Sequence, residues 1–218
     1  MSDVKALAGR LDAEFNSFHQ ATKQLQQTAQ KEYEARESRF RTLYVPAAAR
    51  VVEIVKPRLA LLVERFQDRV DVSPVVTEHT REITLKFNSP LARVNLLFRM
   101  GHDAEVKNLV LEQSLEILPI LMEYDSHSSL TLPLEKVEDD KIVNWLDDRL
   151  VKFVQTVAAM HRNQFYLKDH LVMDPIAGVQ MPKFAAKATI QSGGRTHYFI
   201  SDETKREFEE RQKGAAKK

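Results

Sequence analysis

The sequence predicts an α+β fold: long N-terminal helices, an antiparallel meander sheet of four to five strands, a further long helix, and a small C-terminal module of a β-hairpin and a helix. Residues 3–42 contain no proline and carry apolar residues near heptad spacing. Between residues 83 and 133, apolar and polar residues alternate in short runs separated by turns. Residues 138–165 return to helical spacing. Because helices flank the sheet, we expect them to cover one of its faces.

Composition is typical of a soluble protein and excludes several kinds of site. The 218 residues are 43% hydrophobic and 29% charged with a net charge of +1, so we expect a buried core and no nucleic-acid partner. The absence of cysteine excludes disulfides, thiolate metal sites and a cysteine nucleophile. The start of the sequence lacks a signal-peptide pattern, and no apolar run is long enough to span a bilayer. We therefore expect a cytoplasmic protein with no membrane contact.

Residues 1–45 predict one long helix with an apolar seam. The seam residues lie near heptad spacing: Val4, Leu7, Leu11, Phe18, Ala21 and Leu25. Further along, the same seam is occupied by Thr28, Glu32 and Arg39, and so polar a helix needs a partner to be stable. Two interpretations stay open: a helix packed on its own domain, or a coiled coil between subunits. The second makes the chain a homo-oligomer through this helix.

Residues 46–170 form the predicted core domain, which begins with a second helix. Pro46 marks its start, because proline is favoured in a first helical turn. Pro57 lies inside the helical pattern and predicts a kink or a split. One face of the helix is apolar, through Val51, Val55, Leu59, Leu62 and Phe66.

The rest of this domain is predicted as the sheet and the long helix. We expect strands at 83–87, 94–100 and 109–124, and a last short strand in SSLTLPL. A helix then begins at residues 138–140, whose acidic side chains suit a first turn. Its buried stripe is predicted to contain Ile142, Leu146, Leu150, Phe153, Val157 and Met160.

Residues 171–212 are predicted as a separate small module with two sharp corners. Asp174-Pro175 makes the first turn, and Ser192-Gly193-Gly194 makes a hairpin turn between two strands. Ser201 caps a helix, and Phe208 on that helix faces back onto the hairpin. Residues 213–218 are expected to be a disordered basic tail.

The order of residues in this module resembles a known pattern. The residues concerned are Asp174, Pro175, Gly178, Gly194, Tyr198, Phe199, Ser201 and Phe208, with Met181 slightly late and His197 before the tyrosine. This order is similar to that of the YHS domain, a small family related to treble-clef metal-binding folds. The resemblance implies a treble-clef-like arrangement of the hairpin and the helix.

The module departs from that family at each of the family's cysteine positions, which are occupied here by Ala177, Ile200 and Thr204. None of these side chains suits the ions that thiolates hold, so the metal association of the family does not carry over and we expect no cofactor. We expect an apolar mini-core to hold the corner instead, together with the Ser201 cap. Its members are Ala177, Phe199, Ile200 and Phe208.

Other side chains offer weaker signals of chemistry. Histidines and methionines in or near the module are candidates for a rebuilt metal site: His197, His170, Met173 and Met181. Their spacing does not match a known ligand pattern, so we expect no metal there. No catalytic motif of a hydrolase, nucleotide-binding or dinucleotide-binding protein occurs, so no catalytic residue is assigned.

These observations favour a non-enzymatic cytoplasmic interaction or assembly protein, with a further protein partner besides its own copies. One alternative is a metal-binding or metal-sensing protein that uses histidine and methionine in the module. Another is a small-molecule binder or an enzyme with its site between the sheet and the helices. An enzyme stays open because catalytic groups can converge from distant positions.

Overall fold

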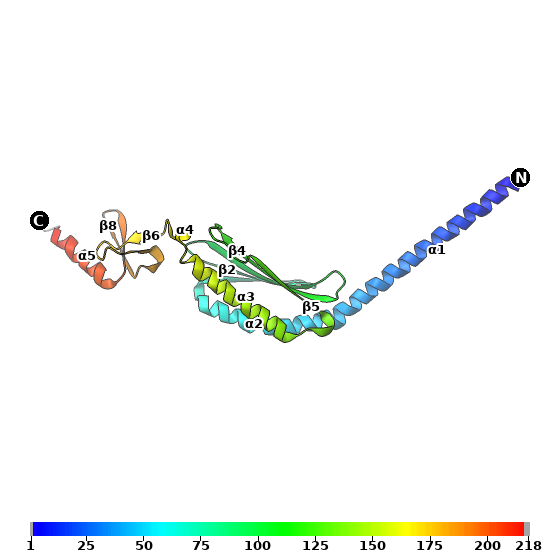
Figure 1. The fold of residues 1–218 in the computed structure, drawn as a ribbon, viewed down its shortest axis with the longest axis horizontal. Coiled ribbons are helices and arrows are strands. Elements are labelled where there is room, and N and C mark those ends of the chain that lie inside the picture. Colours follow the sequence, from blue (N-terminus) through cyan, green and yellow to red (C-terminus); the bar gives the residue numbers. More distant parts are fainter. Residues whose placement is uncertain (1, 216–218) are drawn as a thin grey trace.

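The computed structural model describes residues 2–215, and its elements follow the predicted α+β order. A long helix extends away from a helix-and-sheet head, and a small module lies at the opposite end of the molecule (Figure 1). The N-terminus and the C-terminal module are therefore far apart. This arrangement leaves the long helix free of the head over most of its length.

The head contains most of the secondary structure. Its helices and strands are α2 (Val45–Phe66), β1 (Val70–Val76), β2 (Arg81–Phe87), β3 (Arg93–His102), β4 (Asn108–Leu118), β5 (His127–Pro133), α3 (Asp139–Met160) and α4 (Gln164–Leu167). Short 3₁₀ turns at Gln67–Arg69 and Leu134–Lys136 join α2 to β1 and β5 to α3.

The N-terminal helix is continuous into the head, which corrects the predicted separation into two helices near residue 45. Helix α1 (Ser2–Arg39) passes through a π-helical segment, Phe40–Tyr44, directly into α2. Pro46 has no N–H to donate to the hydrogen-bond pattern of a regular helix. The wider π turn lies directly before Pro46 and accommodates the missing bond, with Val45 N–H bonded to Phe40 O. At Pro57 a kink or a split was predicted, and the split is wrong, since α2 contains this proline without interruption.

The five strands form an antiparallel meander in the order β1-β2-β3-β4-β5. The register pairs Ile83 with Phe98 and Phe98 with Gln113, so these residues share one face of the sheet. Strand β1 was not predicted from the sequence, because Ser73-Pro74 interrupts it. Pro74 is tolerated there because β1 is an edge strand that pairs only with β2.

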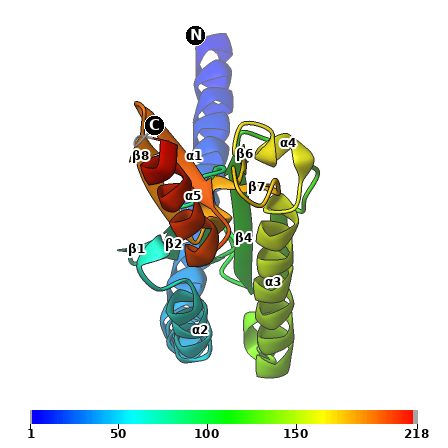
Figure 2. The same ribbon diagram turned by 90° about the vertical axis from the view of Figure 1, so that its left-hand side faces the viewer.

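Helices α2 and α3 lie side by side over one face of the sheet, as predicted (Figures 1 and 2). The core between the layers includes Leu59, Leu85, Leu96, Leu146 and Phe153. Of the stripe predicted for α3, Ile142, Leu146, Phe153 and Met160 are fully buried, and Leu150 and Val157 are partly buried. The opposite face of the sheet carries mainly charged and polar side chains, among them Glu82, Arg99 and Glu112.

The C-terminal module consists of two small hairpins and a helix. They are β6 (Leu171–Met173) with β7 (Gln180–Pro182), β8 (Ala188–Ser192) with β9 (Arg195–Phe199), and α5 (Asp202–Ala215). Gly193 and Gly194 both have positive φ, as a two-residue hairpin turn requires, so the predicted turn is confirmed. Helix α5 reaches Ala215, inside the segment predicted as a disordered tail, and residues 216–218 lie outside the described residues.

Among residues 2–215, no helix combines the length and the apolar content that crossing a bilayer requires.

Candidate functional site

The first corner of the module is built around the Asp174 side chain. Its Oδ1 accepts hydrogen bonds from the backbone N–H groups of Ile176 (2.8 Å) and Ala177 (3.0 Å), which folds the chain after Pro175 into a tight turn. The turn closes with a 2.9 Å bond from Gly178 N–H to the Asp174 carbonyl, and Gly178 has a positive φ that suits glycine. Aspartate and glycine therefore fix this corner locally.

The second corner, where β9 meets α5, is tied to the same carboxylate. Oδ2 of Asp174 accepts from Ile200 N–H at 2.9 Å and from the Thr204 hydroxyl at 2.8 Å. Ser201 caps α5 by accepting from Thr204 N–H, so the predicted cap is confirmed. One carboxylate, with its side chain fully buried, thus joins two corners that lie far apart in the sequence.

The three positions at which the YHS pattern has cysteine all donate to Asp174: Ala177, Ile200 and Thr204. The predicted mini-core is therefore wrong in part, because Ala177 is exposed and Ile200 is 45% exposed. The physical reason is that the corners direct N–H and O–H groups inward. Such donors need an acceptor rather than hydrocarbon.

Phe199 is the apolar centre of the module. It is fully buried, and its ring contacts that of Phe208 on α5 at 5.3 Å between centroids. His197, on the same side of β9, also packs against Phe208, with 4.7 Å between the ring centroids. Phe208 thus faces the hairpin as predicted, and the His197 ring makes a packing contact. Tyr198 lies on the opposite side of the strand and is half-buried.

The remaining metal-ligand candidates do not converge. Met181 is buried opposite Val172, whereas Met173 pairs with Gln180 and is 63% exposed, so the two thioethers lie on opposite faces of the β6–β7 hairpin. His170 precedes this hairpin, where its carbonyl accepts from Lys183 N–H. Within residues 2–215, no group of three or more His, Asp or Glu side chains could hold a metal ion.

The hydrogen bonds to Asp174 lower its pKa from the ordinary 3.8. Burial by itself raises this pKa, but the N–H groups of Ile200, Ala177 and Ile176, and the Thr204 hydroxyl, together outweigh it. The folded module therefore favours the charged carboxylate more than the unfolded chain does. The resulting stabilisation is complete above the unfolded pKa and is lost as the pH falls through the folded pKa.

This linkage predicts selective loosening of the module in acid. We expect the amides of Ile176, Ala177 and Ile200 to lose hydrogen-exchange protection below about pH 4, before the amides of β3 and β4 do. The measurement is hydrogen exchange by NMR between pH 6 and pH 3, corrected for the intrinsic rate. Equal protection of the three amides across this range would contradict the assigned role of the carboxylate.

A second candidate site is an apolar groove in the head, between α2 and the β1 side of the sheet. It has a volume of about 350 Å³. The helices do not fully cover β1, so Val52 and Val76 remain exposed at its rim (38% and 67%). Side chains from both layers line it, among them Val52, Leu59, Val76, Ile83, Phe98 and Trp145. The groove lies between sheet and helices, where a small-molecule site was one expectation, and most of the residues that line it are apolar.

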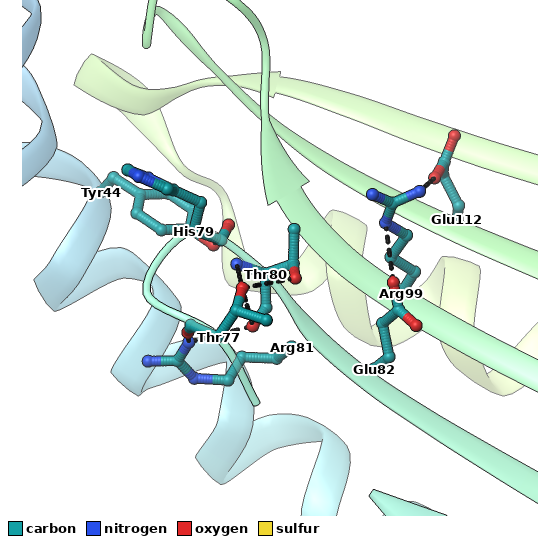
Figure 3. Close-up of polar contacts among 8 residues, drawn as sticks. All are labelled: Tyr44, Thr77, His79, Thr80, Arg81, Glu82, Arg99 and Glu112. Atoms are coloured by element: carbon teal, nitrogen blue, oxygen red, sulfur yellow. Dashed lines mark hydrogen bonds and ion pairs between the residues drawn. The ribbon is translucent and has the colours of Figure 1, made fainter. Parts of the chain in front are cut away.

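Five charged residues also line this groove: Lys56, Arg81, Glu82, Arg99 and Glu112. Arg81 shares the helix-facing side of β2 with Ile83 and Leu85, and its guanidinium points toward the N-terminal helix (Figure 3). Through Nη1 it donates to the carbonyls of Thr77 and Thr80, in the turn between β1 and β2. Tyr44 lies close by: burial raises the pKa of its hydroxyl and Arg81 partly offsets this. The tyrosine therefore stays neutral and donates to His79 O at 2.7 Å.

Arg81 differs from its neighbour Arg99 in its lack of a carboxylate partner. Arg99, on the opposite face of the sheet, binds Glu82 at 3.1 Å and lies 3.9 Å from Glu112 (Figure 3). Lys56 is another basic residue of the groove. In the described part of the chain, no carboxylate oxygen lies within 4.0 Å of the side-chain nitrogens of Arg81 or Lys56. The sequence offered one clue to Arg81, because this residue has the same parity in β2 as the apolar residues Ile83 and Leu85.

A third candidate surface is the seam of α1. Val4, Leu7, Leu11, Phe18 and Leu25 are between 50% and 73% exposed. Phe15, adjacent to the seam, is also exposed and widens it. The helix projects from the head and contacts it only near its C-terminal end, where Arg39 donates to Glu105 O (Figure 1). A contiguous apolar stripe of this kind is uncommon on a monomer, which makes α1 a candidate interface.

Comparison of the chain with protein-family models, with curated proteins and with solved structures gave no match.

Proposed function

We propose that this protein is a non-enzymatic assembly protein whose α1 helices pair between copies of the chain. The observation that carries this proposal is the exposed apolar seam on α1. A helix that is polar elsewhere and projects into solvent gains little stability from its own domain. Pairing along the seam buries the apolar side chains and supplies the partner that such a helix needs.

The overall arrangement supports the same role. The helix and the C-terminal module lie at opposite ends of the molecule (Figure 1). Paired helices therefore hold several heads together and leave each module accessible to a protein partner. The side chains described at the three candidate surfaces make hydrogen bonds, ion pairs and packing contacts. These contacts are consistent with a non-enzymatic role.

We also propose that residues 171–212 are a YHS-like module that has exchanged its cysteines for a carboxylate-centred corner. The order of residues, the glycine hairpin and the serine-capped helix support this assignment. Convergence of Ala177, Ile200 and Thr204 on Asp174 supports it further, because the positions that would share a ligand centre share an acceptor instead.

Energy transfer between labelled chains tests the pairing of α1. The chain has no cysteine, so Asn16→Cys provides one labelling site on the side of α1 away from the seam. We expect strong transfer when donor-labelled and acceptor-labelled chains are mixed, because Asn16 lies near the middle of the apolar part of the seam and is close to its counterpart in either helix orientation.

A label on the head serves as the control. Lys86→Cys, in β2 on the polar face of the sheet, places the label on the head instead of on α1 and should show weaker transfer. Absence of transfer at Asn16, even at high protein concentration, would contradict pairing through this helix.

A further inference from the structure

We propose that the groove beside β1 binds an aliphatic carboxylate, with the alkyl chain along the apolar walls and the carboxylate at Arg81. The groove opens on the helix-facing side of the sheet edge, where Val52 and Val76 remain exposed. Its volume of about 350 Å³ falls at the small end of ligand sites, which run from roughly 300 to 1,000 Å³. That size suits one alkyl chain of medium length.

The charge at the end of the groove selects the head group. Both hydrogen bonds of Arg81 use Nη1, so Nε and Nη2 have no acceptor among residues 2–215. These two nitrogens form the side of a guanidinium that binds a carboxylate through two parallel hydrogen bonds. Lys56 on α2 adds a second unpaired positive charge along the groove, whereas the carboxylates in the lining, Glu82 and Glu112, are both paired with Arg99. An anionic head group can therefore form an ion pair with the half-buried Arg81, whereas a neutral head group cannot.

The walls of the groove argue against a peptide as the occupant. An extended peptide carries an N–H and a C=O at every residue, and each needs a hydrogen-bond partner when it is buried. Most of the lining residues are aliphatic or aromatic, including Leu59, Ile83 and Phe98, and within the described chain the groove offers no row of backbone partners for a peptide. An alkyl chain has no polar groups to satisfy there, so its entry leaves no hydrogen bond unmade.

Trp145 provides a direct readout, because it is the single tryptophan of the chain and it lines the groove. Titration of the full chain with dodecanoate, below the concentration at which it forms micelles, should change Trp145 emission saturably. Dodecanol should bind at least tenfold more weakly, because it lacks the charge that Arg81 pairs with.

Variants at Arg81 and at an arginine outside the groove separate recognition of the head group from non-specific hydrophobic binding. We expect Arg81→Gln to weaken dodecanoate binding by about tenfold or more, Arg81→Lys to weaken it less, and neither to alter the binding of dodecanol. Arg93→Gln removes a similar charge on the other face of the sheet, at a residue that does not line the groove, and should leave dodecanoate binding unchanged. Circular dichroism of each variant checks that the fold is retained.

Three results would overturn the proposal. The first is no saturable change with dodecanoate. The second is equal affinity for dodecanoate and dodecanol in the wild-type chain. The third is Trp145 emission that depends on protein concentration and ignores dodecanoate, which would assign the groove to a segment of another copy.

Discussion

Replacement of Asp174 by asparagine is expected to unfold the C-terminal module while the head stays folded. The carboxylate accepts four hydrogen bonds, from Ile176, Ala177, Ile200 and Thr204. An amide keeps one acceptor oxygen but places an NH₂ group against the donors at the other position. Hydrogen bonds to a charged group contribute about 1.5–3 kcal/mol each, so losing two of them costs about 3 kcal/mol or more. A module this small has little stability to lose.

The head and the module can be observed separately in this experiment. Trp145 lies in the head, where its Nε1 donates to Ser128 Oγ, and its fluorescence follows unfolding of the head alone. Amide exchange of β8 and β9 follows the module. Asp169→Asn, at an exposed aspartate nearby, removes the same charge and should leave both signals unchanged. Retained protection of β8 and β9 in the Asp174→Asn chain would contradict the account of this corner.

Charges placed on the α1 seam are expected to convert the protein into single chains. Leu11→Lys combined with Phe18→Lys puts cations at two exposed seam positions. In a pair of helices each substitution occurs on both chains, and burying each leucine or phenylalanine contributes about 1.5–3 kcal/mol. Losing these contributions weakens association at least about a thousandfold. Light scattering after gel filtration measures the change in mass.

The matched control places the same charges away from the seam. Asn16→Lys with Gln30→Lys adds two cations to the outer side of α1 and should leave the mass unchanged. Because lysine is a good helix former, neither variant should lower helix content through propensity alone. Equal masses for the seam variant and the control would show that α1 is not the associating surface.

Periodicity alone predicted most of the fold. The heptad-like run of α1 and the alternation of β2 and β3 each depend on a regular face against a core or a partner, and such faces are visible in sequence. Strand β1 escaped prediction because Ser73-Pro74 interrupts it and its residues are mostly exposed. The π turn escaped because nothing local distinguishes it from a helix start at Pro46.

The candidate sites were less predictable because they depend on long-range contacts. Asp174 was recognised as part of a turn, but its bonds to Ile200 and Thr204 join positions that only the fold brings together. The corner was predicted to be apolar because the side chains there include Ala177 and Ile200, whereas backbone N–H groups decide its chemistry. Arg81 was overlooked although its parity in β2 places it on the apolar face.

The mass of the wild-type chain in solution tests the central claim most directly. It should be measured by light scattering over a wide range of protein concentration, on protein without a purification tag. Pairing through α1 predicts a mass of at least twice the 25.1 kDa chain, falling toward a single chain only on strong dilution. A mass of 25.1 kDa at every concentration would contradict the assembly role.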